Sequence, residues 1–243
     1  MESQIAAVVE ELQDRLQTLP IGLDYRRAFI ETYRRTTEAV GHALTEGVFE
    51  DADWVSRWDV VFAHLFLDAH DADLSDAVVP RPWRLAFGAP GDHHLLVHLL
   101  LGMNAHINYD LPRAMLAVIS ADDFDHPELL ERRRRDHVRI DAVLAARVDA
   151  EDRELVGSRR VRDRLLTPLN RLSSRRFLRE ARRCVWHNVL ELDTARRLGP
   201  GAYQARVAEL EVLSAAKIAD LLRPGQVLVR LAVVGFGVRL PPV

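Results

Sequence analysis

Apolar residues recur with helical spacing along almost the whole chain, and this periodicity is the feature that most limits its fold. Near the N-terminus Ile5, Val8, Leu12 and Leu16 follow the i, i+3/i+4 rule, and similar stripes continue to residue 222. Only residues 227–240 have a strand-like composition, and a single strand has no partner with which to build a sheet. The pattern therefore predicts an all-α bundle of about eight to ten helices.

Proline, glycine and capping residues mark where these helices should begin and end. We expect Asp92 to cap a helix over residues 93–109, and Pro224-Gly225 to close a helix over residues 203–222. Further helices are predicted at residues 127–148, 159–172 and 175–198. Because the chain has no internal repeat and no Gly/Ser-rich linker, residues 1–243 are predicted to form a single helical domain.

The composition excludes several classes of partner and site. A formal net charge of -3 gives no electrostatic footprint for nucleic acid or an anionic membrane. The longest apolar stretch, residues 227–238, is too short for a membrane helix and contains Arg230. The one cysteine, Cys184, excludes an internal disulfide and a cysteine-based zinc site. We therefore expect a cytoplasmic protein that acts on a small-molecule substrate, with a homodimer through residues 227–238 as one option.

Ten histidines are the part of the composition that points to chemistry. Five of them precede an acidic residue by four positions, whereas roughly 1.5 would do so by chance, since 36 of 243 residues are acidic. In a helix this spacing places both side chains on one face, where they could bind a metal ion together or orient each other. The pairs are His42/Glu46, His64/Asp68, His106/Asp110, His137/Asp141 and His187/Glu191.

Two of these pairs are predicted to face the protein interior. Asp141 lies on a stripe with Ile140 and Leu144, where an unpaired carboxylate would be costly, so His137/Asp141 is the best candidate on spacing. His106/Asp110 lies in a segment dense in polar groups after an apolar run. For both pairs, a satisfied hydrogen bond in the core remains the competing interpretation.

The other pairs rank lower, and the rest of the polar segment adds candidates. His187/Glu191 shares a face with Cys184 and small residues, so it ranks third, while His42/Glu46 is most simply a surface pair. Asn104 and Asn108 accompany His106 and Asp110, and such groups are expensive in an apolar helix unless they bond to each other or to a ligand.

The polar segment also carries a resemblance to a known family. The string Gly-Met-Asn-Ala-His-Ile-Asn-x-Asp-Leu at residues 102–111, together with Arg57-Trp58-Asp59 and Pro82-Trp83, resembles an uncharacterised bacterial family described as a domain of unknown function. Residues 139–144 also resemble its pattern, although the family usually has asparagine at the position of Asp141. The resemblance implies a single helical domain with its site at Asn104, His106, Asn108 and Asp110. It implies no established activity.

Three functions are compatible with these residues. In the first, a metal-dependent hydrolase cleaves a phosphate ester or an acyl group with a divalent Zn, Mn or Fe ion. His106 and Asp110 would be catalytic, and Asn104 and Asn108 would bind the substrate. The proposed metal ligands are His98, His106, Asp110, His137, Asp141 and His187. In the second, a metal-free cyclase or isomerase uses His106 and Asp110 as acid and base. In the third, the chain is a non-catalytic helical binding protein whose polar cluster fixes the core register.

Overall fold

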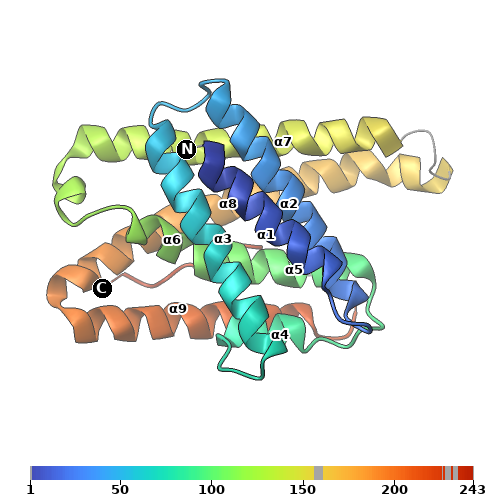
Figure 1. The fold of residues 1–243 in the computed structure, drawn as a ribbon. Coiled ribbons are helices and arrows are strands. Elements are labelled where there is room, and N and C mark those ends of the chain that lie inside the picture. The colour runs from blue at the N-terminus through green and yellow to red at the C-terminus, as the bar shows by residue number, and fades with distance from the viewer. Residues whose placement is uncertain (1, 156–160, 226, 228–230, 232–234, 243) are drawn as a thin grey trace.

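The described part of the protein is built from α-helices, which confirms the predicted fold class (Figure 1). The computed structural model describes residues 2–155, 161–225, 227, 231 and 235–242, and the side chains of residues 4–143 and 180–242 within these ranges. No strand occurs in those residues. The elements are α1 (Glu2–Gln17), α2 (Asp24–Thr45), α3 (Ala52–Leu74), α4 (Arg81–Phe87), α5 (Leu95–Ala105), the π-helix η1 (His106–Asp110), α6 (Leu111–Ala117), the short 3-10 helix η2 (Asp122–Asp125), α7 (Pro127–Leu155), α8 (Val161–Leu198) and α9 (Pro200–Leu221).

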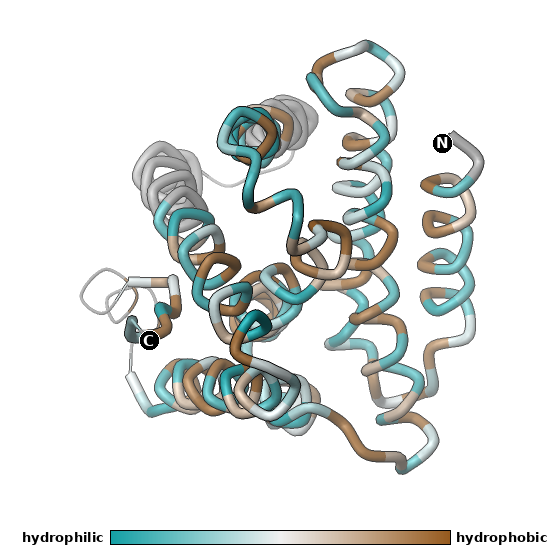
Figure 2. The backbone as a smooth tube through the Cα atoms, turned by 90° about the vertical axis from the view of Figure 1, so that its left-hand side faces the viewer, coloured by the Kyte–Doolittle hydropathy of each residue, from teal (hydrophilic) through white to brown (hydrophobic). Residues whose placement is uncertain are grey.

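The core is centred on α3, which contributes a row of aromatic side chains. Asp51 begins this helix by accepting a hydrogen bond from the Trp54 backbone. Trp54, Trp58, Phe62 and Phe66 then recur every fourth residue and are buried. They belong to one cluster of buried apolar side chains that extends from α1 to the C-terminal segment. Figure 2 shows the matching alternation of hydrophobic and hydrophilic residues along the helices. None of the described helices is long and apolar enough to cross a membrane.

The helices α1, α2 and α3 cross in front of α7 and α8, as Figure 1 shows. Helix α8 passes directly into α9 through Gly199, whose φ of 121° is readily adopted only by glycine. The helices predicted at residues 159–172 and 175–198 are, from residue 161 onward, one helix, α8, while residues 159 and 160 lie outside the described residues. The helix predicted at residues 127–148 extends to Leu155. Helix ends are the least certain part of a prediction from periodicity, because an exposed turn carries no apolar stripe.

The segment that carries the polar motif is one continuous helical run from Leu95 to Ala117, with a π-helical turn at its centre. His94, and not Asp92, is its N-cap, and the His94 ring accepts a hydrogen bond from the Leu96 backbone at 3.1 Å. The run continues past the predicted end at residue 109 into α6, with Pro112 in the turn that directly follows the π-helix. The π-turn holds His106 and Asp110, and such turns are frequent at functional sites.

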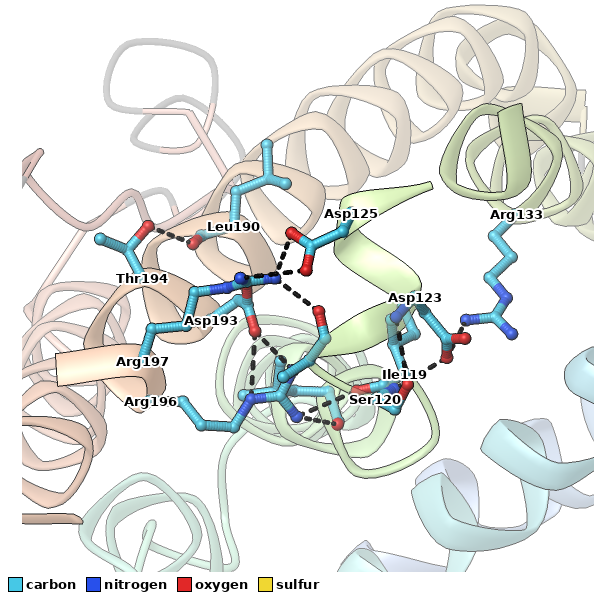
Figure 3. A network of polar contacts seen from close by, with 12 residues as sticks. Ile119, Ser120, Asp123, Asp125, Arg133, Leu190, Asp193, Thr194, Arg196 and Arg197 are labelled. Atoms are coloured by element: carbon cyan, nitrogen blue, oxygen red, sulfur yellow. Dashed lines mark hydrogen bonds and ion pairs between the residues drawn. The ribbon is translucent and has the colours of Figure 1, made fainter. Parts of the chain in front are cut away.

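Ion pairs attach the loop between α6 and α7 to the end of α8 (Figure 3). Arg196 and Arg197 both pair with Asp193, three and four residues before them on α8. Arg196 also donates to the Ile119 carbonyl at 2.9 Å, and Arg197 pairs with Asp125 of η2 at 3.1 Å. The contacts connect two parts of the chain more than 70 residues apart and so fix where α7 begins.

Candidate functional site

The His106–Asp110 pair is brought together as predicted, inside the core. The Nδ1 atom of His106 lies 3.1 Å from Oδ2 of Asp110, and the two side chains are 4% and 1% exposed. The same Oδ2 accepts a hydrogen bond of 2.7 Å from Nε1 of Trp83, and Arg113 Nη1 lies 3.4 Å from Oδ1. Asp110 is thus held by α4 and α6 while it orients the imidazole of His106.

Aromatic side chains surround the imidazole of His106. Its ring stacks on Phe62 with a centroid distance of 3.5 Å and an angle of 6°, and Tyr33 meets it edge-on at 4.5 Å. The rings of Phe29, Phe66 and Trp83 lie at 6.0, 6.1 and 5.9 Å. These rings exclude water and fix the plane of the imidazole.

The second nitrogen of His106, Nε2, is buried and has no hydrogen-bond partner. Burial lowers the pKa of His106, and the hydrogen bond that His106 donates to Asp110 opposes this effect without cancelling it. The imidazole is therefore neutral at neutral pH. With Nδ1–H donated to Asp110, Nε2 carries the lone pair and can accept a proton.

Asp59 is a further site residue, which was not among those predicted from the sequence. It lies on α3, one turn before Phe62, and is 4% exposed with no hydrogen-bond partner for its Oδ2 atom. Burial raises the pKa of Asp59 to about 7, against the opposing charge of Arg182. A carboxylic acid in this range can donate a proton near neutral pH. The available signal was an acidic residue within the apolar stripe of α3.

Tyr33 is the third polar group beside the His106 ring. Its hydroxyl is buried and has no hydrogen-bond partner, and its ring lies 4.5 Å from that of His106. Burial raises the pKa of Tyr33 well above its usual value, and the charges of Asp59 and Asp110 add to this effect. Tyr33 stays protonated at neutral pH and can only donate a hydrogen bond to an anion. His106, Asp59 and Tyr33 form what we call the aromatic-core site.

Asn104 and Asn108, predicted to bind substrate, instead hold the C-terminal segment, residues 235–242. Their Nδ2 atoms both donate to the Phe236 carbonyl, at 3.2 and 3.0 Å. The Oδ1 atom of Asn108 accepts from the Val238 backbone at 2.9 Å. The amide of Asn108 is thus bonded to backbone through both its nitrogen and its oxygen, whereas the Oδ1 atom of Asn104 is buried without a hydrogen-bond partner.

Two residues of α8 hold the same segment farther along. Asn188, which the sequence analysis did not select, donates to the Val238 carbonyl and accepts from the Leu240 backbone, both at 2.9 Å. His187 lies beside it, and its Nε2 atom donates to the Leu240 carbonyl at 2.9 Å. Glu191 is 3.9 Å from His187 and pairs more closely with Arg206, at 3.0 Å. His187 is therefore a contact of the C-terminal segment.

His137 and Asp141 share a helix but contact Arg182 rather than each other. The Nε2 atom of His137 lies 3.3 Å from the Arg182 carbonyl, and Arg182 Nη1 donates to the His137 carbonyl at 3.2 Å. Asp141 forms an ion pair of 2.6 Å with Nε of Arg182. Burial lowers the pKa of His137 to about 3, and the charge of Arg182 lowers it further. The predicted metal ligand Asp141 is therefore paired with the guanidinium of Arg182.

The six residues predicted to bind a divalent metal are not gathered into one site. Across residues 2–155, 161–225 and the described C-terminal positions, no group of three or more His, Cys, Asp and Glu side chains could hold a metal ion. Asp110, Asp141 and His187 are each bonded within the chain. His98, on α5, lies instead against Tyr25, with ring centroids 4.5 Å apart. These residues do not fit a metal centre.

One comparison with known proteins gives a match, and this match covers most of the chain. A family model described as a family of unknown function (DUF5995) matches residues 5–224. The matched part includes the aromatic-core site and the three asparagines but not the C-terminal segment at residues 235–242. No curated protein and no solved structure matches the chain.

Proposed function

The chain belongs to DUF5995, a family of unknown function, and on that footing we propose that it is a proton-transfer enzyme whose general base is His106. The reaction would be an isomerisation or cyclisation of a small apolar molecule, the second of the three functions considered from the sequence. One observation carries the proposal: the Nδ1 atom of His106 is bonded to Asp110, while its buried Nε2 atom has no partner.

The unpartnered nitrogen is difficult to explain by stability alone. Leaving a buried polar group without a hydrogen bond costs about 1–3 kcal/mol. A phenylalanine at position 106 would keep the stacking on Phe62 without that cost. Trp83 and Arg113 both bond to Asp110 and so fix the carboxylate that orients the His106 ring. Packing of the core alone does not require two such bonds. A base that must accept a proton at a defined position needs this arrangement.

The neighbouring groups supply the other half of a proton transfer. Nε2 of His106 would remove a proton from the substrate, and the Asp110 carboxylate would stabilise the resulting imidazolium. Protonated Asp59 would return a proton to another substrate atom, and the Tyr33 hydroxyl would donate a hydrogen bond to developing negative charge. The substrate loses one proton and gains one, so it needs no co-reactant; the enzyme is restored when the proton on His106 is released to solvent and Asp59 takes one up from it. The aromatic walls favour an apolar substrate.

A generic substrate for base catalysis tests the proposal. A nitrobenzisoxazole opens its ring when a base removes its carbon-bound proton, and the nitrophenolate released is coloured. We expect the wild type to accelerate this opening at pH 7.5 and the His106→Phe variant to be at least about tenfold slower. The surface variant His42→Phe is the matched control and should retain the wild-type rate. Equal rates for wild type and His106→Phe would refute the role of His106.

Stability provides the second readout. If His106 serves the reaction, His106→Phe should unfold in urea within about 1 kcal/mol of the wild type, since it removes an unsatisfied group and preserves the stacking. A loss of more than about 3 kcal/mol would mean that the His106–Asp110 pair is part of the core. That result would favour the third function considered from the sequence, a binding protein with a structural polar cluster.

A further inference from the structure

A small, partly open cavity lies between α2, α3, α4 and α5, next to the aromatic-core site. Its volume is about 20 Å³, and its walls include the rings of Phe29, Phe66 and Trp83, which contact His106 through the same side chains. A space of this size holds one water molecule or one small ion. Arg26, His70 and His98 also line the cavity, so a space lined mainly by aromatic and aliphatic residues has three basic side chains.

These three side chains are buried and have nitrogen atoms without partners. Arg26, His70 and His98 are 8%, 1% and 5% exposed. Nη2 of Arg26 pairs with Asp73 at 2.7 Å, but its Nε and Nη1 atoms have no hydrogen-bond partner. Neither ring nitrogen of His70 has a partner, and the same holds for His98. Buried donors are almost always satisfied in proteins, so a group of them around one cavity indicates a ligand.

The charge of the cavity selects the ligand. The Arg26 guanidinium remains charged and is positioned over the Phe87 ring, 4.4 Å from its centroid. A cation would be repelled by this group. Burial lowers the pKa of His70 to about 4 and also lowers that of His98, so both rings are neutral at pH 7 and can each donate one N–H. A positive guanidinium with neutral donors around it suits an anion with several acceptor oxygens.

Charged groups outside the cavity do not reverse this preference. The charges of Arg26, Asp71, Arg15 and Asp73 act on the pKa of His70, and His93, Asp92 and a hydrogen bond with the Pro90 backbone act on that of His98. Asp71 is bonded to Arg15 at 2.8 Å, and Asp73 to Nη2 of Arg26 at 2.7 Å. An anion in the cavity would therefore bind to the Nε and Nη1 atoms of Arg26, which have no partner.

We propose that the cavity is a binding site for a small carboxylate, held by Arg26 and His70 and closed by His98. The volume admits the carboxylate group itself or an anion the size of formate. The site is separate from the proposed role of His106 and does not rest on it.

Formate is the probe for this site. We expect the melting temperature of the protein to rise saturably with sodium formate at constant ionic strength, and the NMR-measured pKa of His70 to rise with it, because a bound anion stabilises the imidazolium. Acetate should bind more weakly than formate, since its methyl group exceeds the cavity. A thermal shift that grows without saturation, or equally with acetate and formate, would be a general salt effect and would overturn the proposal.

Variants locate the binding. Arg26→Gln should abolish the response to formate, whereas Arg27→Gln, which makes the same charge change at the next position of α2, should retain it. Since Arg26→Gln also breaks the pair with Asp73, His70→Leu is a second variant that keeps Arg26. It should weaken formate binding at least about tenfold. An unchanged affinity in His70→Leu would overturn the assignment of this cavity.

Discussion

Asn108 and Val238 are 130 residues apart in the chain and are joined by a hydrogen bond of 2.9 Å from the Val238 backbone to the Asn108 side chain. The same asparagine donates to the Phe236 carbonyl at 3.0 Å, so one amide pairs with the backbone as a neighbouring strand would. Asn188 repeats the arrangement two residues farther along. Backbone N–H and C=O groups of the C-terminal segment thus have hydrogen-bond partners without a sheet, as buried backbone groups require.

Replacing Asn188 should loosen the C-terminal segment. In Asn188→Ala the Val238 carbonyl and the Leu240 backbone N–H lose their partner inside the core. We expect the free energy of unfolding, measured in urea, to fall by about 2–4 kcal/mol. Thr194→Ala, at an exposed position of the same helix, should change it by less than about 0.5 kcal/mol. Equal losses in the two variants would contradict the role of Asn188.

Removing the Trp83 hydrogen bond should change the titration of His106. Trp83→Phe deletes the donor that lies 2.7 Å from Oδ2 of Asp110, and the carboxylate then acts more strongly on the imidazole. We expect the pKa of His106, followed by NMR, to rise. Trp186→Phe, which alters a ring beside His137, should leave it unchanged. A fall in the pKa of His106 in Trp83→Phe would show that the tryptophan acts mainly by packing.

Asp59 should make the protein less stable as the pH rises. Its pKa is about 7 in the folded protein and about 3.9 in an unfolded chain. Between these two pH values the unfolded chain binds fewer protons at Asp59 than the folded protein does. The free energy of unfolding therefore falls by about 1.4 kcal/mol for each unit by which the pH rises. Asp59→Asn lacks this dependence. From pH 5 to pH 7 the wild type should lose about 2–3 kcal/mol relative to the variant, and parallel curves would contradict the shift.

His137 should act in the opposite direction. Its pKa is about 3 in the folded protein and about 6.5 when unfolded. Its contribution is complete above pH 6.5 and is lost as the pH falls, because the unfolded chain gains a proton that the folded protein does not. In His137→Gln the amide can still donate to the Arg182 carbonyl. Denaturation in urea should show the wild type losing about 2 kcal/mol relative to this variant from pH 7 to pH 5, and the absence of such a loss would argue against a neutral buried ring.

Gly102 sets the position of Phe29 against the aromatic-core site. A Cβ atom at this position would lie 2.6 Å from Cδ2 of Phe29, whose ring also contacts Phe66, Trp83 and His106. Gly102→Ala should therefore destabilise the protein by about 1–3 kcal/mol in thermal or urea denaturation. Gly201→Ala, on α9, meets no atom within 4 Å and should be neutral or slightly stabilising. A stable Gly102→Ala protein would mean that Phe29 can move freely.

The C-terminal segment shows why a sequence pattern can identify an unusual stretch without giving its environment. Residues 227–240 have a strand-like composition, and residues 227–238 offer one option for a homodimer surface. In the described part of the segment, Phe236, Val238 and Leu240 are buried against their own chain. The backbone of this segment is bonded by Asn188, 50 residues before Val238, and by Asn108, 130 residues before it. No local sequence pattern encodes such a pairing.

The helical class and the His106–Asp110 contact could be predicted from sequence, because both follow from distances that a helix fixes between residues a few positions apart. The same spacing at His137 and Asp141 gives no contact, since Arg182 reaches Asp141 from α8. That Trp83 bonds to Asp110, that Phe62 stacks on His106 and that Asp59 is buried with a raised pKa follow from the packing of the helices. Those features depend on how helices pack across long sequence separations, where many side chains compete for each partner and burial alone sets the cost of leaving one without a bond.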